Sequence, residues 1–90
     1  MLHIISLSPN QMRIFESYLR TASKEDVFLF INDGVYLIAL CPDLPKQCYA
    51  LNDDVQARGI KLPTKVKGIN INDFVDLTEQ HECIQHWKLS

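Results

Sequence analysis

Five short apolar runs set the expected order of strands along the chain. Residues 2–6 (LHIIS) and 27–31 (VFLFI) are runs of strand length, and the second suits a strand that is buried on both faces. Residues 47–51 (QCYAL) predict a third strand, 64–69 (TKVKGI) a less apolar fourth and 83–87 (CIQHW) a short last one. We therefore expect a sheet of four or five strands.

The segment after the first run has the spacing of a helix. Ser8 is placed to act as N-cap, with Pro9 at the first helical position, where its missing N–H is no loss. Beyond them, apolar residues recur at steps of three and four along one side of a helix: Met12, Phe15, Leu19 and Ala22. An amphipathic helix is predicted here.

Two later helices are predicted from their ends. Asn52 is expected to cap a short helix over 53–59, whose first turn is acidic and which Gly59 ends in the left-handed conformation. A further helix is predicted at 71–81, with Asn72 as a plausible cap. Its apolar side consists of Phe74, Val75 and Leu77.

The Asp33–Gly34 pair between two apolar runs permits different structures. An Asp-Gly pair in this setting is a strong signal for a β-hairpin, and 35–40 (VYLIAL) has good strand propensity. The same residues also fit one side of a short helix that Pro42 would end, with Gly34 permitting the bend. No glycine-rich run or basic residue accompanies the pair, so it does not resemble a phosphate cradle. The alternation of strands and helices elsewhere favours the helix.

Composition and charge narrow the class of protein. Strand–helix alternation indicates an α/β fold, a mostly parallel sheet with helices on both faces, and residues 1–90 are expected to form one domain. The formal net charge of -2 argues against general attraction to nucleic acid or to an anionic membrane. No apolar run approaches the roughly 20 residues of a membrane helix, and the first residues lack the basic flank of a secretion signal. A cytoplasmic location without membrane contact is predicted.

The three cysteines are the main candidates for chemistry. Cys41, Cys48 and Cys83 form no C-x-x-C pair and are expected to be small packed side chains without disulfides. Cys83 is the most exposed of them in this interpretation and the one persulfide candidate, without other catalytic residues. His81 and His86 flank Cys83, but three ligands without a second cluster fall short of a zinc site, so neither a metal nor a cofactor is predicted.

Several ordered motifs resemble one protein family from end to end. They are MLHIISLSP at 1–9, INDGVYLIAL at 31–40, YALNDDVQARGI at 49–60, INDFVDLT at 71–78 and IQHW at 84–87. Together they resemble the DsrH/TusB family. The resemblance implies a small DsrE/F/H-like fold and a subunit of a heterohexamer with TusC- and TusD-like partners. In the TusBCD branch that assembly relays persulfide sulfur towards 2-thiouridine at the tRNA wobble position, and the principal sulfur-carrying cysteine belongs to the TusD-type partner.

One position separates the branches of this family. DsrH proteins of sulfur oxidisers carry a cysteine in the first helix, whereas the matching stretch here is ESYL with Tyr18 at that place. Because a phenol cannot form a persulfide, the TusB branch fits better. The resemblance thus implies a non-catalytic subunit with only an indirect relation to tRNA. Its contacts with sister subunits are expected to centre on aromatic anchors, for which Tyr18, Tyr36 and Trp87 are our candidates.

Two alternatives stay open. The chain could be a small sulfurtransferase that uses its own Cys83 or Cys41. It could also be a stand-alone module, such as a homodimer, in a cell without the related subunits. Activity of the isolated chain in a persulfide-transfer assay would distinguish the first alternative from the second.

Overall fold

A five-stranded sheet, parallel throughout, forms the centre of the computed structural model, which describes residues 1–41, 44 and 47–86. The strands are β1 (Leu2–Ile5), β2 (Val27–Phe30), β3 (Cys48–Leu51), β4 (Val66–Ile69) and β5 (Cys83–His86). They lie in the order β4-β3-β2-β1-β5, and each neighbouring pair is parallel. The prediction of a mostly parallel sheet of four or five strands is confirmed.

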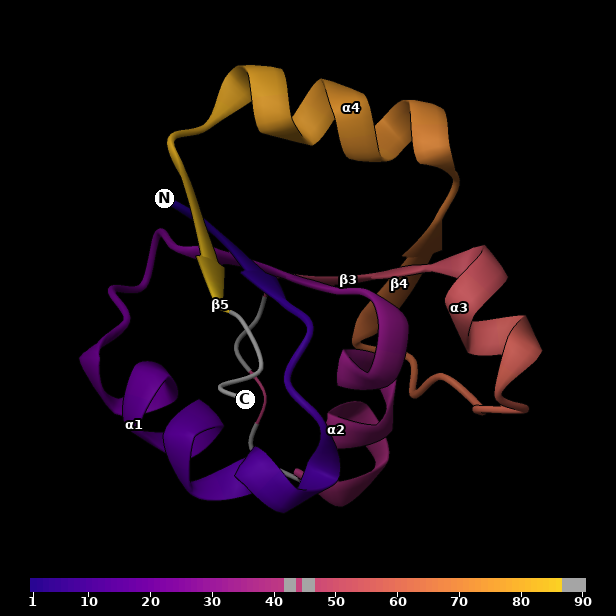
Figure 1. Cartoon of the computed structure of the whole chain (residues 1–90). Coiled ribbons are helices and arrows are strands. Elements are labelled where there is room, and N and C mark those ends of the chain that lie inside the picture. Colours follow the sequence, from indigo (N-terminus) through magenta and orange to yellow (C-terminus); the bar gives the residue numbers. More distant parts are fainter. Residues whose placement is uncertain (42–43, 45–46, 87–90) are drawn as a thin grey trace.

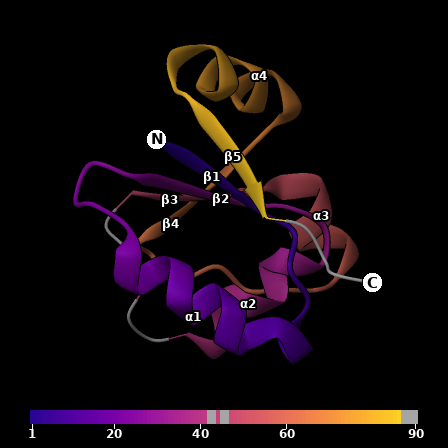
Figure 2. The ribbon, with the colours of Figure 1, turned by 60° about the vertical axis from the view of Figure 1, so that its left-hand side comes forward.

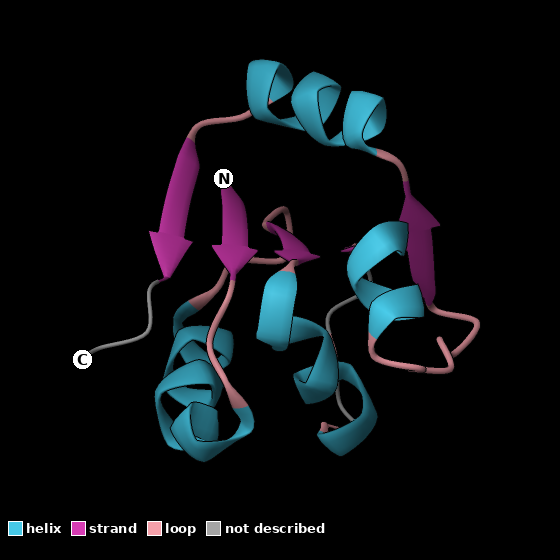
Figure 3. Ribbon diagram, turned by 45° about the vertical axis from the view of Figure 1, so that its right-hand side comes forward, coloured by secondary structure: helices cyan, strands magenta, loops and turns pink. Residues whose placement is uncertain are grey.

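Helices cover both faces of the sheet, as predicted. On one face lie α1 (Met12–Thr21), α2 (Val35–Leu40) and α3 (Asn52–Ala57), while α4 (Ile71–Gln80) crosses the opposite face from β4 to β5 (Figures 1 and 2). The short 3₁₀ turns η1 (Pro9–Gln11) and η2 (Asn32–Gly34) precede α1 and α2. Figure 3 shows how α4 carries the chain back over the sheet, so that β5 is placed beside β1.

The two faces bury separate apolar clusters because side chains alternate along each strand. The larger cluster joins Phe28 and Phe30 of β2 to the helices α1 to α3, with the ring of Phe15 edge-on to both at centroid distances of 6.4 and 5.6 Å. The smaller cluster contains Leu2, Ile4, Val27, Leu29 and Ile69 and is covered by Phe74 and Leu77 of α4. The two-sided burial predicted for the second strand is confirmed, since all four of its residues are buried.

The chain turns into a helix after Asp33–Gly34, so the hairpin alternative is wrong. Gly34 permits this bend through its lack of a side chain, because its φ of -59° is ordinary for a helix and a Cβ there would meet the carbonyl oxygen of Ile5. The position therefore requires glycine for space and not for backbone freedom. The left-handed residue of this turn is Asn32, with φ 50°.

The predicted ends of the helices are partly right. Ser8 precedes the first turn with Pro9, and its backbone N–H donates to Oε1 of Gln11 at 3.2 Å in a capping box. Gly59, with φ 63°, provides the left-handed exit from α3. The cap assignments of Asn52 and Asn72 are wrong, because both residues lie inside their helices: α3 begins at Asn52 and α4 at Ile71, each earlier than a cap at that asparagine would allow.

The strands explain why those two helices begin early. β3 runs directly into α3, so that Leu51 is the N-cap and Asn52 the first helical residue, its side chain packed over Gly68. Only Asn70 separates β4 from α4, and its Oδ1 accepts a hydrogen bond from the N–H of Asp73 at 2.9 Å. An asparagine does cap this helix, two positions before the one expected.

Candidate functional site

At the carboxyl ends of β2 and β3, Arg58 connects two loops. Its Nε donates to Oδ1 of Asp33 at 3.1 Å, and its Nη2 lies 3.1 Å from the same oxygen. Its Nη1 lies 3.5 Å from Oδ1 of Asp54, one helical turn earlier, and donates to the carbonyl oxygen of Asp54 at 3.3 Å. The guanidinium thus holds the start of α2 against α3.

The same carboxylates fix the strained turn before α2. The backbone N–H of Asn32 donates to Oδ2 of Asp54 at 2.8 Å, and this bond supports the left-handed conformation of Asn32. Arg58 also lies 6.0 Å from the ring centroid of Tyr36, a cation–π distance. Asp33 and Asp54 face a cation, and this cluster holds the fold together without presenting a free nucleophile.

At the amino ends of the strands, the carboxylate of Asp26 accepts hydrogen bonds from four donors. Nε2 of His3 lies 2.9 Å from Oδ2 of Asp26, and the N-terminal ammonium donates to Oδ1 at 3.3 Å. The N–H and Oγ of Ser23 both donate to the same carboxylate at 3.1 Å. The bond from His3, with the smaller contributions of Ser23 and the ammonium, outweighs the opposing effect of burial and holds the pKa of Asp26 well below its usual range.

Sequence reasoning missed this cluster because 23 residues separate its two principal members. His3 is buried and stacks on Phe28 with ring centroids 4.6 Å apart. A histidine within an apolar strand was the available signal, since a buried imidazole requires a polar partner.

The cysteines occupy three different environments. Cys48 is buried in β3, and that burial raises the pKa of its thiol to about 12. Cys41 is half-buried just after α2, and its backbone N–H donates to the carbonyl oxygen of Leu37 at 3.0 Å. No disulfide joins the three cysteines, all of which lie in the described part of the chain.

Cys83, the persulfide candidate, is exposed at the start of β5, as expected. Its Sγ lies 3.7 Å from the carbonyl oxygen of Thr78 and 3.5 Å from that of His81. Carbonyl oxygens accept a hydrogen bond from the protonated thiol, whereas a reactive thiolate is stabilised by a cation or by N–H donors. The role of Cys83 in sulfur transfer stays a hypothesis, and these contacts do not favour it.

Of the three aromatic residues predicted for an interface, the structure describes two. Tyr18 is half-buried on α1 and packs against the larger cluster, and Tyr36 is half-buried on α2 beside Arg58. Trp87 lies outside the described residues. Their role at an interface stays a prediction.

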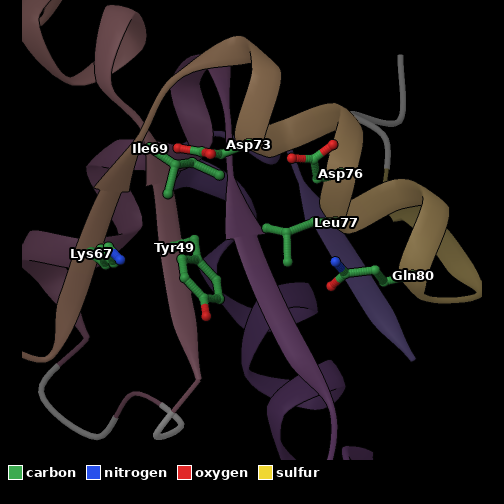
Figure 4. Close-up of a pocket in the computed structure, with 7 residues that line it drawn as sticks. All are labelled: Tyr49, Lys67, Ile69, Asp73, Asp76, Leu77 and Gln80. Carbon is green, nitrogen blue, oxygen red and sulfur yellow. The ribbon is translucent and has the colours of Figure 1, made fainter.

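A groove of about 240 Å³ lies between α4 and the sheet (Figure 4). Its lining consists of Tyr49, Lys67 and Ile69 from β3 and β4, with Asp73, Asp76, Leu77 and Gln80 from α4. Sequence analysis did not identify this groove. The available signal was spacing, since residues 67 and 69 share a strand face and residues 73, 76, 77 and 80 share a side of a helix.

The described residues offer neither a metal-binding cluster nor a membrane-spanning helix. Among the described residues, no group of three or more His, Cys, Asp or Glu side chains is placed to hold a metal ion. Within the same ranges, none of the helices is both long and apolar enough to span a membrane.

Comparison with known proteins decides the family. The family model described as "DsrH like protein" matches residues 7–84 of the chain. The chain belongs to the DsrH family. DsrH-family relatives named Protein TusB include one from Serratia proteamaculans, 34% identical over 96 aligned positions that cover 97% of this chain and all of the relative. One from Escherichia coli O81 is 35% identical over 97 positions, with the same coverage.

A solved structure supports the DsrH-family fold. The solution NMR structure of protein Tm0979 from Thermotoga maritima superimposes with a TM-score of 0.70 at 28% sequence identity. The match covers 91% of this chain and 95% of that one. The small α/β fold that the resemblance implied is therefore confirmed.

Proposed function

We propose that this DsrH-family chain is a non-catalytic subunit of a cytoplasmic sulfur-relay complex that supports 2-thiouridine formation at the tRNA wobble position. The observation that carries the proposal is the similarity over nearly the whole length to relatives named Protein TusB. Its partners would be TusC- and TusD-type subunits in a heterohexamer, one of which supplies the sulfur-carrying cysteine.

The environments of two of the three thiols support a role without chemistry of its own. Burial keeps Cys48 protonated, and the contacts of Cys83 are to carbonyl oxygens. Tyr18 stands at the position where sulfur oxidisers have a cysteine. The chain would contribute contact area that positions the partner's reactive cysteine.

Replacing all three cysteines with serine tests whether the sulfur chemistry belongs to the partner subunits and not to this chain. We expect the triple variant to assemble with the TusC- and TusD-type subunits and to sustain thiolation of tRNA in a reconstituted relay. Native mass measurement of the complex verifies assembly. Loss of thiolation in a fully assembled complex would overturn the non-catalytic role.

A sulfurtransferase that uses Cys83 is the second candidate, and the exposure of that thiol is the observation in its favour. Incubation of the isolated chain with a persulfide donor, followed by mass spectrometry, distinguishes the two. A mass increase of one sulfur atom at Cys83, absent from a Cys83→Ser variant, would support the second candidate.

A further inference from the structure

The segment around α4 combines exposed aliphatic side chains with charges of one sign. Ile71 is 57% exposed and Val75 is 46% exposed, and they lie one helical turn apart on the same side of the helix. Between Gly68 and His86 the chain carries four acidic residues and neither Lys nor Arg. The four are Asp73, Asp76, Glu79 and Glu82.

α4 is itself less buried than α2 on the other face of the sheet. None of its ten residues, all within the described part of the chain, is buried, whereas α2 buries three of six. Its contact with the sheet is made by Phe74 and Leu77, which are partly buried. The apolar side chains on the outward side of this helix therefore stay available to a further protein layer.

The groove beside α4 has the chemistry to receive a basic side chain. Asp73 and Asp76 supply carboxylates along the wall formed by α4, while Ile69 and Leu77 supply apolar contacts for an aliphatic stem. The ring of Tyr49 forms part of the floor and can also face a cation. Lys67 lies on the side of the groove away from Asp76 and Gln80, so it leaves that end acidic (Figure 4).

We propose that α4 and its groove form the docking surface for a non-identical protein subunit whose contact surface has an aliphatic centre and a basic rim. The aliphatic centre packs on Ile71 and Val75, and an Arg or Lys of the partner enters the groove beside Asp76. This inference rests on the proposed function, because it assigns this surface to the TusC- or TusD-type subunits.

Charge argues against a symmetric pair of identical chains as the occupant. A two-fold contact through α4 would place the same patch of each copy against the other. The acidic side chains of α4 in one copy would then lie near those of the second copy, and such like-charge contacts are unfavourable. A partner with Lys or Arg around its apolar centre meets the same surface with complementary charge.

A matched pair of lysine substitutions tests the apolar centre. The chain is co-expressed with the TusC- and TusD-type subunits of its own organism, and affinities are measured by titration of the purified components. We expect Val75→Lys to weaken binding by about tenfold or more, because it places a charged side chain in the aliphatic centre of the contact. Leu40→Lys is the control. Leu40 is 56% exposed at the end of α2, which covers the opposite face of the sheet. This substitution should change affinity by less than about twofold.

A double variant tests the charged rim. Asp73→Asn with Asp76→Asn preserves side-chain size and removes both carboxylates of the groove. We expect a several-fold slower association and a weaker dependence of affinity on NaCl concentration than in the natural chain. Thermal unfolding followed by circular dichroism verifies that every variant is folded.

The outcomes separate this inference from the proposed function. If the natural chain binds neither sister subunit, the proposed function fails, and the assignment of the partner fails with it. If a complex forms but Val75→Lys leaves it intact, or if Leu40→Lys weakens it equally, the proposed function stands and the surface is wrong. Self-association of the isolated chain that Val75→Lys abolishes would assign the surface to a second copy instead.

Discussion

Nε2 of His3 lies 2.9 Å from Oδ2 of Asp26, and this contact ties the first strand to the turn before the second. It joins the sheet to a carboxylate that also holds the N-terminal ammonium and Ser23. The contact makes the stability of the fold sensitive to acid.

The depressed pKa of Asp26 predicts the direction of that sensitivity. Asp26 binds a proton more weakly in the folded protein than in the unfolded chain, where the pKa is about 3.9. Its stabilising contribution is therefore complete above about pH 5 and is lost as the pH falls towards the folded-state pKa. We expect Asp26→Asn to reduce the free energy of unfolding at pH 7 by about 2 kcal/mol.

Urea unfolding between pH 7 and pH 2.5 measures this effect. The natural chain should lose more stability over the acidic part of the range than Asp26→Asn does, because the variant has already lost the titrating carboxylate. Asp53→Asn, at an exposed position in the first turn of α3, is the control. Parallel stability curves for Asp26→Asn and the natural chain would contradict the prediction.

Two glycines distinguish the need for space from the need for a special backbone conformation. We expect Gly34→Ala to cost about 2–3 kcal/mol, because the added Cβ meets the main chain at Ile5 and Ser6, which cannot rotate away. Gly59→Ala should cost about 1 kcal/mol, since Gly59 has open space around it but a φ of 63°. Denaturant unfolding of both variants gives the order, and the reverse order would show that backbone conformation governs both positions.

The turn before α2 predicts unequal roles for the two carboxylates that contact Arg58. Asp54 has a side chain 19% exposed and accepts the backbone N–H of Asn32, whereas the side chain of Asp33 is 51% exposed. We expect Asp54→Ala to lower the free energy of unfolding by about 1.5 kcal/mol. Asp33→Ala should lower it by less than about 0.5 kcal/mol, because exposed ion pairs contribute little. Equal losses in chemical denaturation would indicate that the ion pairs, and not the bond to Asn32, stabilise this turn.

The three thiols should react with a thiol-specific reagent in a fixed order. Cys83 is exposed and should be modified first, and the half-buried Cys41 should follow more slowly. Cys48 should resist modification at pH 8 until the chain is unfolded in urea, because it is buried and its pKa is about 12. Peptide mapping after timed labelling assigns each site, and early modification of Cys48 would show that β3 opens in the native protein.

Much of the fold was accessible to sequence reasoning because the strands are short apolar runs separated by helical spacing. The alternation also resolved Asp33–Gly34 correctly, although the local residues permitted a hairpin as well as a helix. Helix ends were less accessible. Asn52 and Asn72 are good N-cap residues by type. The strands β3 and β4 end so close to the helices, however, that Leu51 and Asn70 occupy the N-cap positions.

The candidate sites were less predictable because they join residues far apart in the sequence. Nothing in the local sequence around Arg58 indicates its contact with Asp33, which is 25 residues away. The groove under α4 depends on β3 and β4 lying side by side, which no spacing within one segment reveals. The branch of the family, in contrast, was read from one position, Tyr18.

The placement of β5 beside β1 has a consequence for how the protein forms during synthesis. β1 emerges first from the ribosome, but one of its two neighbours is the strand at 83–86, so half of its backbone hydrogen-bonding partners are synthesised some eighty residues later. Until then the nascent chain exposes an unpaired strand edge that is rich in Leu and Ile. Completion of the sheet is thus a late, long-range step, and slower translation of the codons for β5 prolongs the interval in which the chain is prone to aggregate.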